Sequence, residues 1–149
     1  SEMCIRDRVW GDAGFNAKAF EDIEQLIWEK FICNVAWSGS CSIFRKTLGE
    51  VMNNEYMFDI AKGCALEARK MGDLKKVNFT FENTVEYITE FGKKLLHSKP
   101  SMLQDIEAKK LCEIDAINGM VVTLGEKNNI KTPYNSVVTS LIKAQELEY

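Results

Sequence analysis

The stretch IWEKFICNVAWS, residues 27–38, decides the fold class of this chain. Apolar side chains recur around it at spacings of three and four residues, which is the pattern of one face of an α-helix and not of a strand. The spaced residues are Phe20, Ile23, Ile27, Phe31, and Asn34 or Val35. Asn16 is suited to cap this helix. We expect the helix to reach Leu48, with a kink at SGS (38–40) and an end at Gly49.

The rest of the chain repeats the helical pattern, and no alternating apolar run predicts a strand. Further helices are expected over about 54–71, 82–96, 112–127 and 134–147. Gly72 is expected to end the second of the five predicted helices, and Pro133 is suited to start the last. The predicted fold class is therefore all-α, and the length of 149 residues suits one domain.

The composition argues against two classes of binding partner, nucleic acid and membrane. The net charge of −3 comes from interspersed acids and bases, without the basic block that nucleic acid or an anionic membrane would require. No apolar run approaches the roughly 20 residues of a membrane span, and no signal peptide is evident. We therefore expect a cytoplasmic protein that binds neither nucleic acid nor membrane.

Cofactor motifs are absent from the sequence. The five cysteines are scattered without a C-x-x-C pair, and His97 is the single histidine, so we expect reduced thiols and no metal site. Neither G-x-G-x-x-G nor G-x-x-x-x-G-K occurs, so the chain is not expected to bind a dinucleotide by itself.

Three polar residues follow one another on the first predicted helix. Lys30, Asn34 and Ser38 are four residues apart, which places an amine, an amide and a hydroxyl about 6 Å apart in a row. This row suits a small anion with several polar groups. In the structural alternative, Lys30 lays its aliphatic stem along the core while Asn34 and Ser38 bond to the backbone.

Two further polar residues lie in the segment after Pro100. Ser101 and Gln104 match the S-x-x-Q capping box, which predicts that the Ser101 hydroxyl caps a helix. Glu113 lies four residues before Ile117, so it is expected to interrupt an apolar helical stripe. An unpaired buried carboxylate is unfavourable, which implies a partner or a ligand; a core ion pair, with Lys30 as one candidate, is the structural alternative.

Four segments in order resemble the C-terminal domain of the ketopantoate reductase (2-dehydropantoate 2-reductase) family. They are IWEKFICNVAWS (27–38), GCALEARKMG (63–72), PSMLQDIEAKKLCEIDAINGMVV (100–122) and NIKTPYNSVVTSLI (129–142). The resemblance implies an all-helical domain of the 6-phosphogluconate dehydrogenase C-terminal-like type. In that family such a domain follows an N-terminal Rossmann domain, which is missing from this chain.

The resemblance also implies an activity, the reduction of 2-dehydropantoate to pantoate with NADPH in pantothenate biosynthesis. By this resemblance Lys30 matches the family's catalytic proton donor. The chemistry agrees, because a lysine in a partly apolar cleft gives up its proton more readily than one in water. Asn34 matches a substrate-binding amide, and Ser101 matches the serine that meets the substrate carboxylate. Glu113 matches the glutamate beside the cofactor and the substrate hydroxyl. A homodimer is a further family expectation.

Two residues depart from the family pattern, so the resemblance does not identify the exact substrate. Ser38 and Leu48 stand where some family members carry asparagines of the substrate pocket. A serine could still reach the substrate through water. Another branched 2-oxo acid therefore remains an alternative substrate, and a non-catalytic helical interaction or dimerisation module is an alternative of another class.

The opening SEMCIRDR fits no pattern downstream. We expect residues 1–8 to be a non-native leader and residues 9–149 to form the helical domain. Without a nucleotide-binding motif, the 149 residues are expected to be inactive by themselves.

Overall fold

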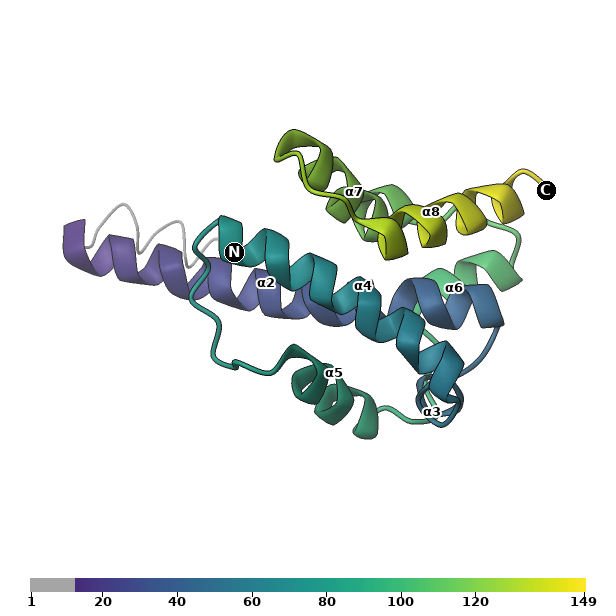
Figure 1. The fold of residues 1–149 in the computed structure, drawn as a ribbon. Helices are drawn as coiled ribbons and strands as arrows, with labels where there is room; N and C mark the ends of the chain where they lie inside the picture. Colours follow the sequence, from purple (N-terminus) through teal and green to yellow (C-terminus); the bar gives the residue numbers. More distant parts are fainter. Residues whose placement is uncertain (1–12) are drawn as a thin grey trace.

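The computed structural model describes residues 13–149, so the expected leader over 1–8 lies outside the described part of the chain. Every regular element between residues 13 and 149 is helical, which confirms the all-α prediction (Figure 1). The elements are α2 (Ala13–Phe44), α3 (Leu48–Met52), α4 (Glu55–Leu74), α5 (Thr84–Lys93), α6 (Ser101–Glu107), the 3-10 helix η1 (Ile114–Ala116), α7 (Asn118–Lys127) and α8 (Pro133–Glu146). No helix in this part is long and apolar enough to cross a membrane.

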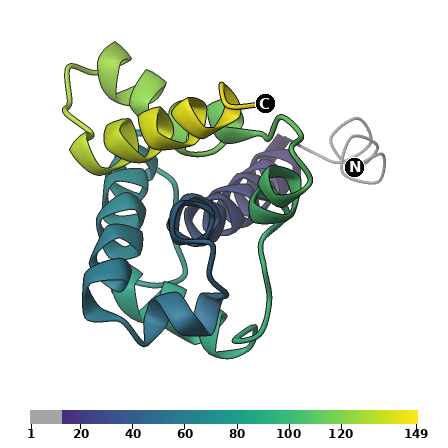
Figure 2. The same cartoon turned by 90° about the vertical axis from the view of Figure 1, so that its right-hand side faces the viewer.

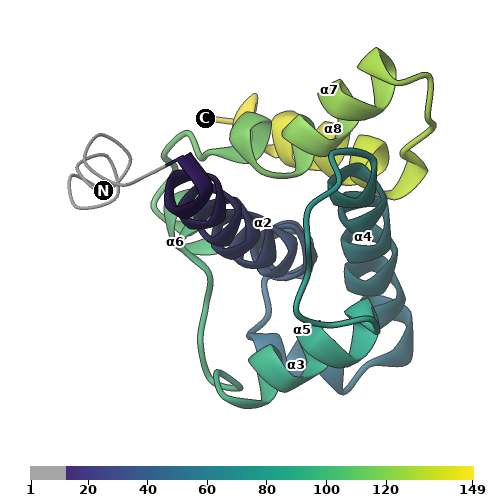
Figure 3. The ribbon, with the colours of Figure 1, turned by 90° about the vertical axis from the view of Figure 1, so that its left-hand side faces the viewer.

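The long helix α2 is the centre of the arrangement. Viewed along its axis, α2 is surrounded by α4, by the pair α7 and α8, by α6, and by α3 with α5 (Figures 2 and 3). Fully buried side chains of α2 such as Ile32 and Val35 belong to the same core as small residues of α4, among them Ala61 and Ala65. Small side chains on α4 allow the two helices to approach closely, which stabilises the core by dense packing.

Helix α2 continues through SGS without interruption and ends at Phe44, so the expected continuation to Leu48 is wrong. The neighbouring serine hydroxyls bond within the helix: Ser40 donates to the Ala36 carbonyl at 2.7 Å, and Ser42 donates to that of Ser38 at 2.6 Å. Gly39 instead allows close packing, since a Cβ there would lie 2.5 Å from Cγ1 of Val138.

Some of the other helix boundaries lie at the residues predicted from the sequence, and some do not. The Asn54 side chain accepts N–H bonds from Tyr56 and Met57 at 3.1 Å, so α4 starts where predicted. Pro133 is the first residue of α8, as expected. Gly72 lies inside α4, and Gly49 lies inside α3, so neither glycine ends a helix. The helix expected over 112–127 is divided into η1 and α7.

Candidate functional site

A small cleft of about 230 Å³ lies where α2, α3, the end of α5 and the start of α6 meet. Its lining brings together Asn34, Ser38 and Ser101, three of the predicted site residues. The other lining residues are Cys33, Trp37, Leu48, Phe91, Leu95 and 98–100. The volume is below the roughly 300–1,000 Å³ of pockets for drug-sized ligands, so the cleft suits a small molecule.

Backbone hydrogen bonds hold one side of this cleft in place. The N–H of Leu48 donates to the carbonyl of Ser98 at 3.2 Å, and the N–H of Gly49 donates to that of Leu96 at 2.8 Å. These donors belong to the first turn of α3, where backbone N–H groups have no partner within the helix. The segment that leads to Ser101 is therefore fixed on the N-terminus of α3.

Helix α2 supplies two polar groups to the cleft. Asn34 is half-buried, and Ser38 is 6% exposed. Neither side chain makes a hydrogen bond with another residue of the described part, so the predicted alternative of side-chain bonds to the backbone is not observed. An amide and a hydroxyl without protein partners remain available to a ligand.

Lys30 is exposed and does not line the cleft. It lies one helical turn before Asn34 on α2, about 6 Å away along the helix axis. The described residues make no ion pair with its amine. The partly apolar surroundings expected for this lysine are therefore not provided by residues 13–149.

The predicted capping role of Ser101 is wrong. Pro100 occupies the N-cap position of α6, Ser101 is the first helical residue, and no side chain caps the helix. The Gln104 amide instead donates to the carbonyl of Lys99 at 2.9 Å. The Ser101 hydroxyl is thereby exposed at the edge of the cleft.

The predicted burial of Glu113 is also wrong. Glu113 is exposed and precedes the 3-10 helix η1, so it does not lie on an α-helical stripe. The buried residue of this segment is its neighbour Ile114, at 1% exposure. Between residues 13 and 149, no ion pair joins Glu113 to Lys30, and Glu113 does not line the cleft.

Cys33 contributes to the floor of the cleft and is unsuited to chemistry there. Burial raises the pKa of its thiol to about 12; a hydrogen bond from Tyr87 opposes the rise, and the charge of Glu29 adds to it. The thiol is therefore protonated at neutral pH and is neither a nucleophile nor a good metal ligand. No group of three or more His, Cys, Asp or Glu side chains that could hold a metal ion occurs in the described residues.

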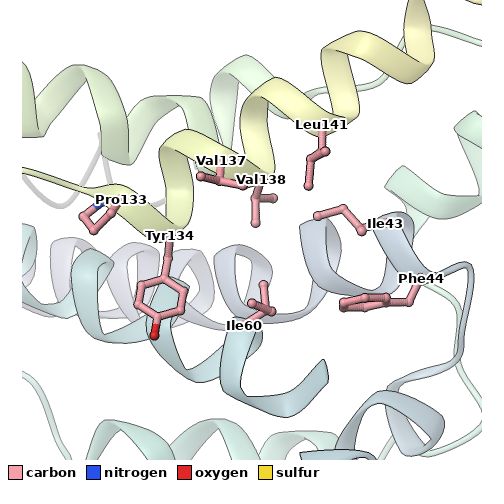
Figure 4. Close-up of a pocket in the computed structure, with 8 residues that line it drawn as sticks. All are labelled: Ile43, Phe44, Ile60, Pro133, Tyr134, Val137, Val138 and Leu141. Carbon is pink, nitrogen blue, oxygen red and sulfur yellow. The ribbon is translucent and has the colours of Figure 1, made fainter. Parts of the chain in front are cut away.

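A larger cavity of about 360 Å³ lies between the end of α2, α4 and α8 (Figure 4). Its lining is apolar except for Tyr134. Binding sites for small polar molecules combine apolar surface with a few polar groups that orient the ligand. The smaller cleft has such groups and is therefore the better candidate.

The lining of the cleft also includes residues that were not predicted as site residues, among them Phe91, Leu95, Ser98 and Lys99. Lys99 forms an ion pair with Glu107 at 3.1 Å. Leu95 was expected on the same side of its helix as Ile88, yet Ile88 is buried and Leu95 is exposed. The spacing of residues within one helix does not predict which residues of another helix line the same cleft.

The fold and the cleft define the chain as an all-helical domain with a small, partly polar cleft. The family model "Ketopantoate reductase PanE/ApbA C terminal" matches residues 22–146. Two relatives named 2-dehydropantoate 2-reductase are similar: that of Streptococcus pyogenes is 34% identical over 91% of this chain and 44% of its own length. That of Archaeoglobus fulgidus is 32% identical over 93% of this chain and 46% of its own. The chain belongs to the family of ketopantoate reductase C-terminal domains and spans less than half the length of these relatives.

Solved structures have the same fold. A PanE/ApbA family ketopantoate reductase from Ralstonia eutropha superposes with a TM-score of 0.77 at 22% identity, covering 83% of this chain and 41% of the other. A D-mandelate dehydrogenase in complex with NADH and anilino(oxo)acetate superposes with a TM-score of 0.72 at 26% identity, covering 82% and 40%.

Proposed function

We propose that the chain is the substrate-binding and catalytic half of an NADPH-dependent reductase that converts 2-dehydropantoate to pantoate, a step of pantothenate biosynthesis. The observation that carries this proposal is the meeting of Asn34, Ser38 and Ser101 in one small cleft, although α2 and α6 are far apart in the sequence. Membership of the family and the names of the relatives support the reaction type.

In this proposal each polar residue has one role. Lys30 donates a proton to the substrate oxygen, which becomes the hydroxyl of the product. Asn34 and Ser38 donate hydrogen bonds to substrate oxygens, and the Ser101 hydroxyl binds the carboxylate. Bound NADPH supplies the hydride that the carbonyl carbon receives.

Residues 13–149 contain neither a strand nor a glycine-rich phosphate loop, the elements with which a Rossmann domain binds a dinucleotide. We infer that an N-terminal nucleotide-binding domain, as in the family, covers the face of α2 that carries Lys30. Leu26 and Ile27 lie on the turn before Lys30 and are 66% and 62% exposed. Exposed large apolar side chains mark an interaction surface. Covering this face would enclose the Lys30 amine between the two domains, and the exposed Glu113 would remain free to contact the cofactor.

The test joins the N-terminal part of the Streptococcus pyogenes relative, which this chain does not span, to the chain. NADPH oxidation with 2-dehydropantoate is then measured. Lys30→Ala is expected to lower kcat at least about 100-fold, because general acid catalysis typically contributes 10²–10⁴-fold. The matched control Lys70→Ala removes an exposed lysine of α4 and should leave the rate within about twofold.

Titration of the chimera with NADPH shows that its nucleotide half is folded. If the chimera binds NADPH and Lys30→Ala keeps the rate within about threefold of the parent, Lys30 is not the proton donor. If it binds NADPH and reduces no 2-oxo acid, the proposed reaction is wrong.

A further inference from the structure

We propose that the C-terminal end of α8 positions Glu113, and that Glu146 is the positioning residue that contributes most. Glu146 acts by holding the backbone beside Glu113 and does not itself contact the substrate or the cofactor. This inference rests on the proposed function, in which Glu113 contacts the cofactor, and it connects α8 with that contact.

The segment before Glu113 has no regular secondary structure. Helix α6 ends at Glu107 and η1 begins at Ile114, so Glu113 lies at the end of an irregular connection. Hydrogen bonds to α6 reach as far as Lys110, whose N–H donates to the carbonyl of Asp105 at 2.8 Å. The residues between there and Glu113 need partners on other elements, because backbone polar groups are rarely left unpaired.

Two contacts from the end of α8 hold the residues just before Glu113. The backbone N–H of Cys112 donates to Oε2 of Glu146 at 2.8 Å. The hydroxyl of Tyr149, three residues later, donates to the carbonyl of Lys110 at 2.9 Å. The irregular connection is therefore tied to one end of a single helix.

A third contact reaches Asp115, two residues after Glu113. Lys143, three residues before Glu146, forms an ion pair with Asp115 at 3.0 Å. Both side chains are more than half exposed, so this pair stabilises little. The bond from Cys112 to Glu146 is partly buried and has a charged acceptor, which makes such bonds about twice as strong as neutral ones.

Glu113 is thus held on both sides while its own carboxylate stays exposed. Ile114, which follows it, is 1% exposed and fixes the segment on the core. The Glu146 bond fixes the segment at Cys112, which precedes it. A carboxylate on a fixed backbone binds a ligand without the entropy cost of ordering the segment first. Loss of the Glu146 bond is expected to reintroduce that cost.

The experiment measures the Kd of NADPH for the chimera described above. Glu113→Ala is expected to raise this Kd at least about fivefold, and Glu146→Ala at least about threefold, because the contact is then lost or disordered. Glu146→Gln keeps a side-chain oxygen that accepts the Cys112 N–H, so it should restore the parent Kd within about twofold.

A double variant distinguishes positioning from a general loss of stability. If Glu146 acts through Glu113, then Glu146→Ala should not raise the Kd further once Glu113 is already alanine. Glu148→Ala is the matched control, since it removes an exposed carboxylate just after α8 and should leave the Kd unchanged. Circular dichroism establishes that each variant is folded.

Tyr149→Phe is a second, milder variant, which keeps the test available if Glu146→Ala does not fold. It removes only the hydroxyl that bonds to Lys110 and should raise the Kd about twofold, again only while Glu113 is present.

The outcomes separate this inference from the proposed function. An unchanged Kd in folded Glu146→Ala, or an equal rise of the Kd with and without Glu113, would overturn the inference. An unchanged Kd in Glu113→Ala would overturn it as well, whereas turnover of 2-dehydropantoate would still support the function. A chimera that shows the expected changes in Kd and reduces no 2-oxo acid would refute the proposed reaction and leave the inference standing.

Discussion

Cys41 is a fully buried thiol of α2, two turns beyond Cys33. Burial raises its pKa from an ordinary 9.0 to about 12, and the charge of Glu50 adds to the rise. Since burial favours the protonated thiol, the stability that this group contributes is fully present below about pH 9. It is lost progressively as the pH rises from about 9 to about 12.

This titration predicts how Cys41→Ala depends on pH. At pH 8 the variant should be less stable than the parent, because the alanine leaves a small cavity. At pH 10.5 the difference in unfolding free energy should be smaller by about 2 kcal/mol, from roughly 1.36 kcal/mol per pKa unit. Urea unfolding at the two pH values measures it, and a difference that does not change with pH would contradict the prediction.

Single residues also show which parts of the site a sequence reveals. Asn34 and Ser38 share a face of the cleft because the spacing of one helix fixes their relation. The position of Glu113 depends instead on the irregular path after α6, where Lys109 has a φ of 57°. Helical periodicity does not describe such a path, so it placed Glu113 on a stripe that does not exist. The functional roles of Lys30, Asn34, Ser38, Ser101 and Glu113 remain predictions.

At the scale of elements, the start of α8 is held by a carboxylate of α4. Glu67 accepts N–H bonds from Tyr134 and Asn135, each at 3.0 Å, and a bond from the Asn135 amide at 2.9 Å. The residue before α8, Thr132, makes no side-chain cap. Glu67 thus performs the capping from another helix and ties α8 to α4.

Glu67→Ala is therefore expected to lower the unfolding free energy by about 1–3 kcal/mol, the range for leaving hydrogen-bond donors without a partner. Hydrogen exchange at the amides of Tyr134 and Asn135 should accelerate as well. Glu126→Ala, which removes an exposed carboxylate of α7, is the control and should change stability by less than about 0.5 kcal/mol. Equal stability of the two variants would show that the cap is not stabilising.

Most of the longer helices could be predicted from sequence, whereas the short helices α3 and η1 and the contacts between elements could not. Asn54 and Pro133 mark helix starts through local chemistry, and the structure confirms both. The Asn118 amide, by contrast, donates to the carbonyl of Val35 at 3.1 Å and to the side chain of Asn135 at 2.9 Å. These buried bonds join α7 to α2 and α8 across 83 and 17 residues, and asparagine in isolation indicates a turn or a cap.

At the scale of the whole molecule, the described helices would form only part of the site of the proposed reductase. In the proposed function the cleft supplies groups for a small acid, but Lys30 is exposed, and residues 13–149 contain no strand of the kind that a Rossmann domain requires. Catalysis by Lys30 would need the substrate carbon, the hydride and the amine to be held in one water-poor space. The chain spans 44% of the length of its Streptococcus pyogenes relative. The remaining part of that relative, more than half of its length, is long enough to hold a second domain that encloses the substrate and the cofactor.

The 149-residue chain is therefore expected to show no NADPH oxidation with 2-dehydropantoate, at less than about 1% of the chimera's rate. The physical reason is that the short chain does not hold NADPH next to the substrate. Holding two reactants in the correct geometry lowers the activation barrier by roughly 7–11 kcal/mol, and this contribution is lost when the cofactor is free in solution. Both proteins are assayed at equal concentration with saturating NADPH, and circular dichroism of the short chain establishes that its helices are intact. Turnover by the folded short chain at a rate near that of the chimera would mean that residues 1–149 hold a cofactor site of their own, and the role proposed for the second domain would be wrong.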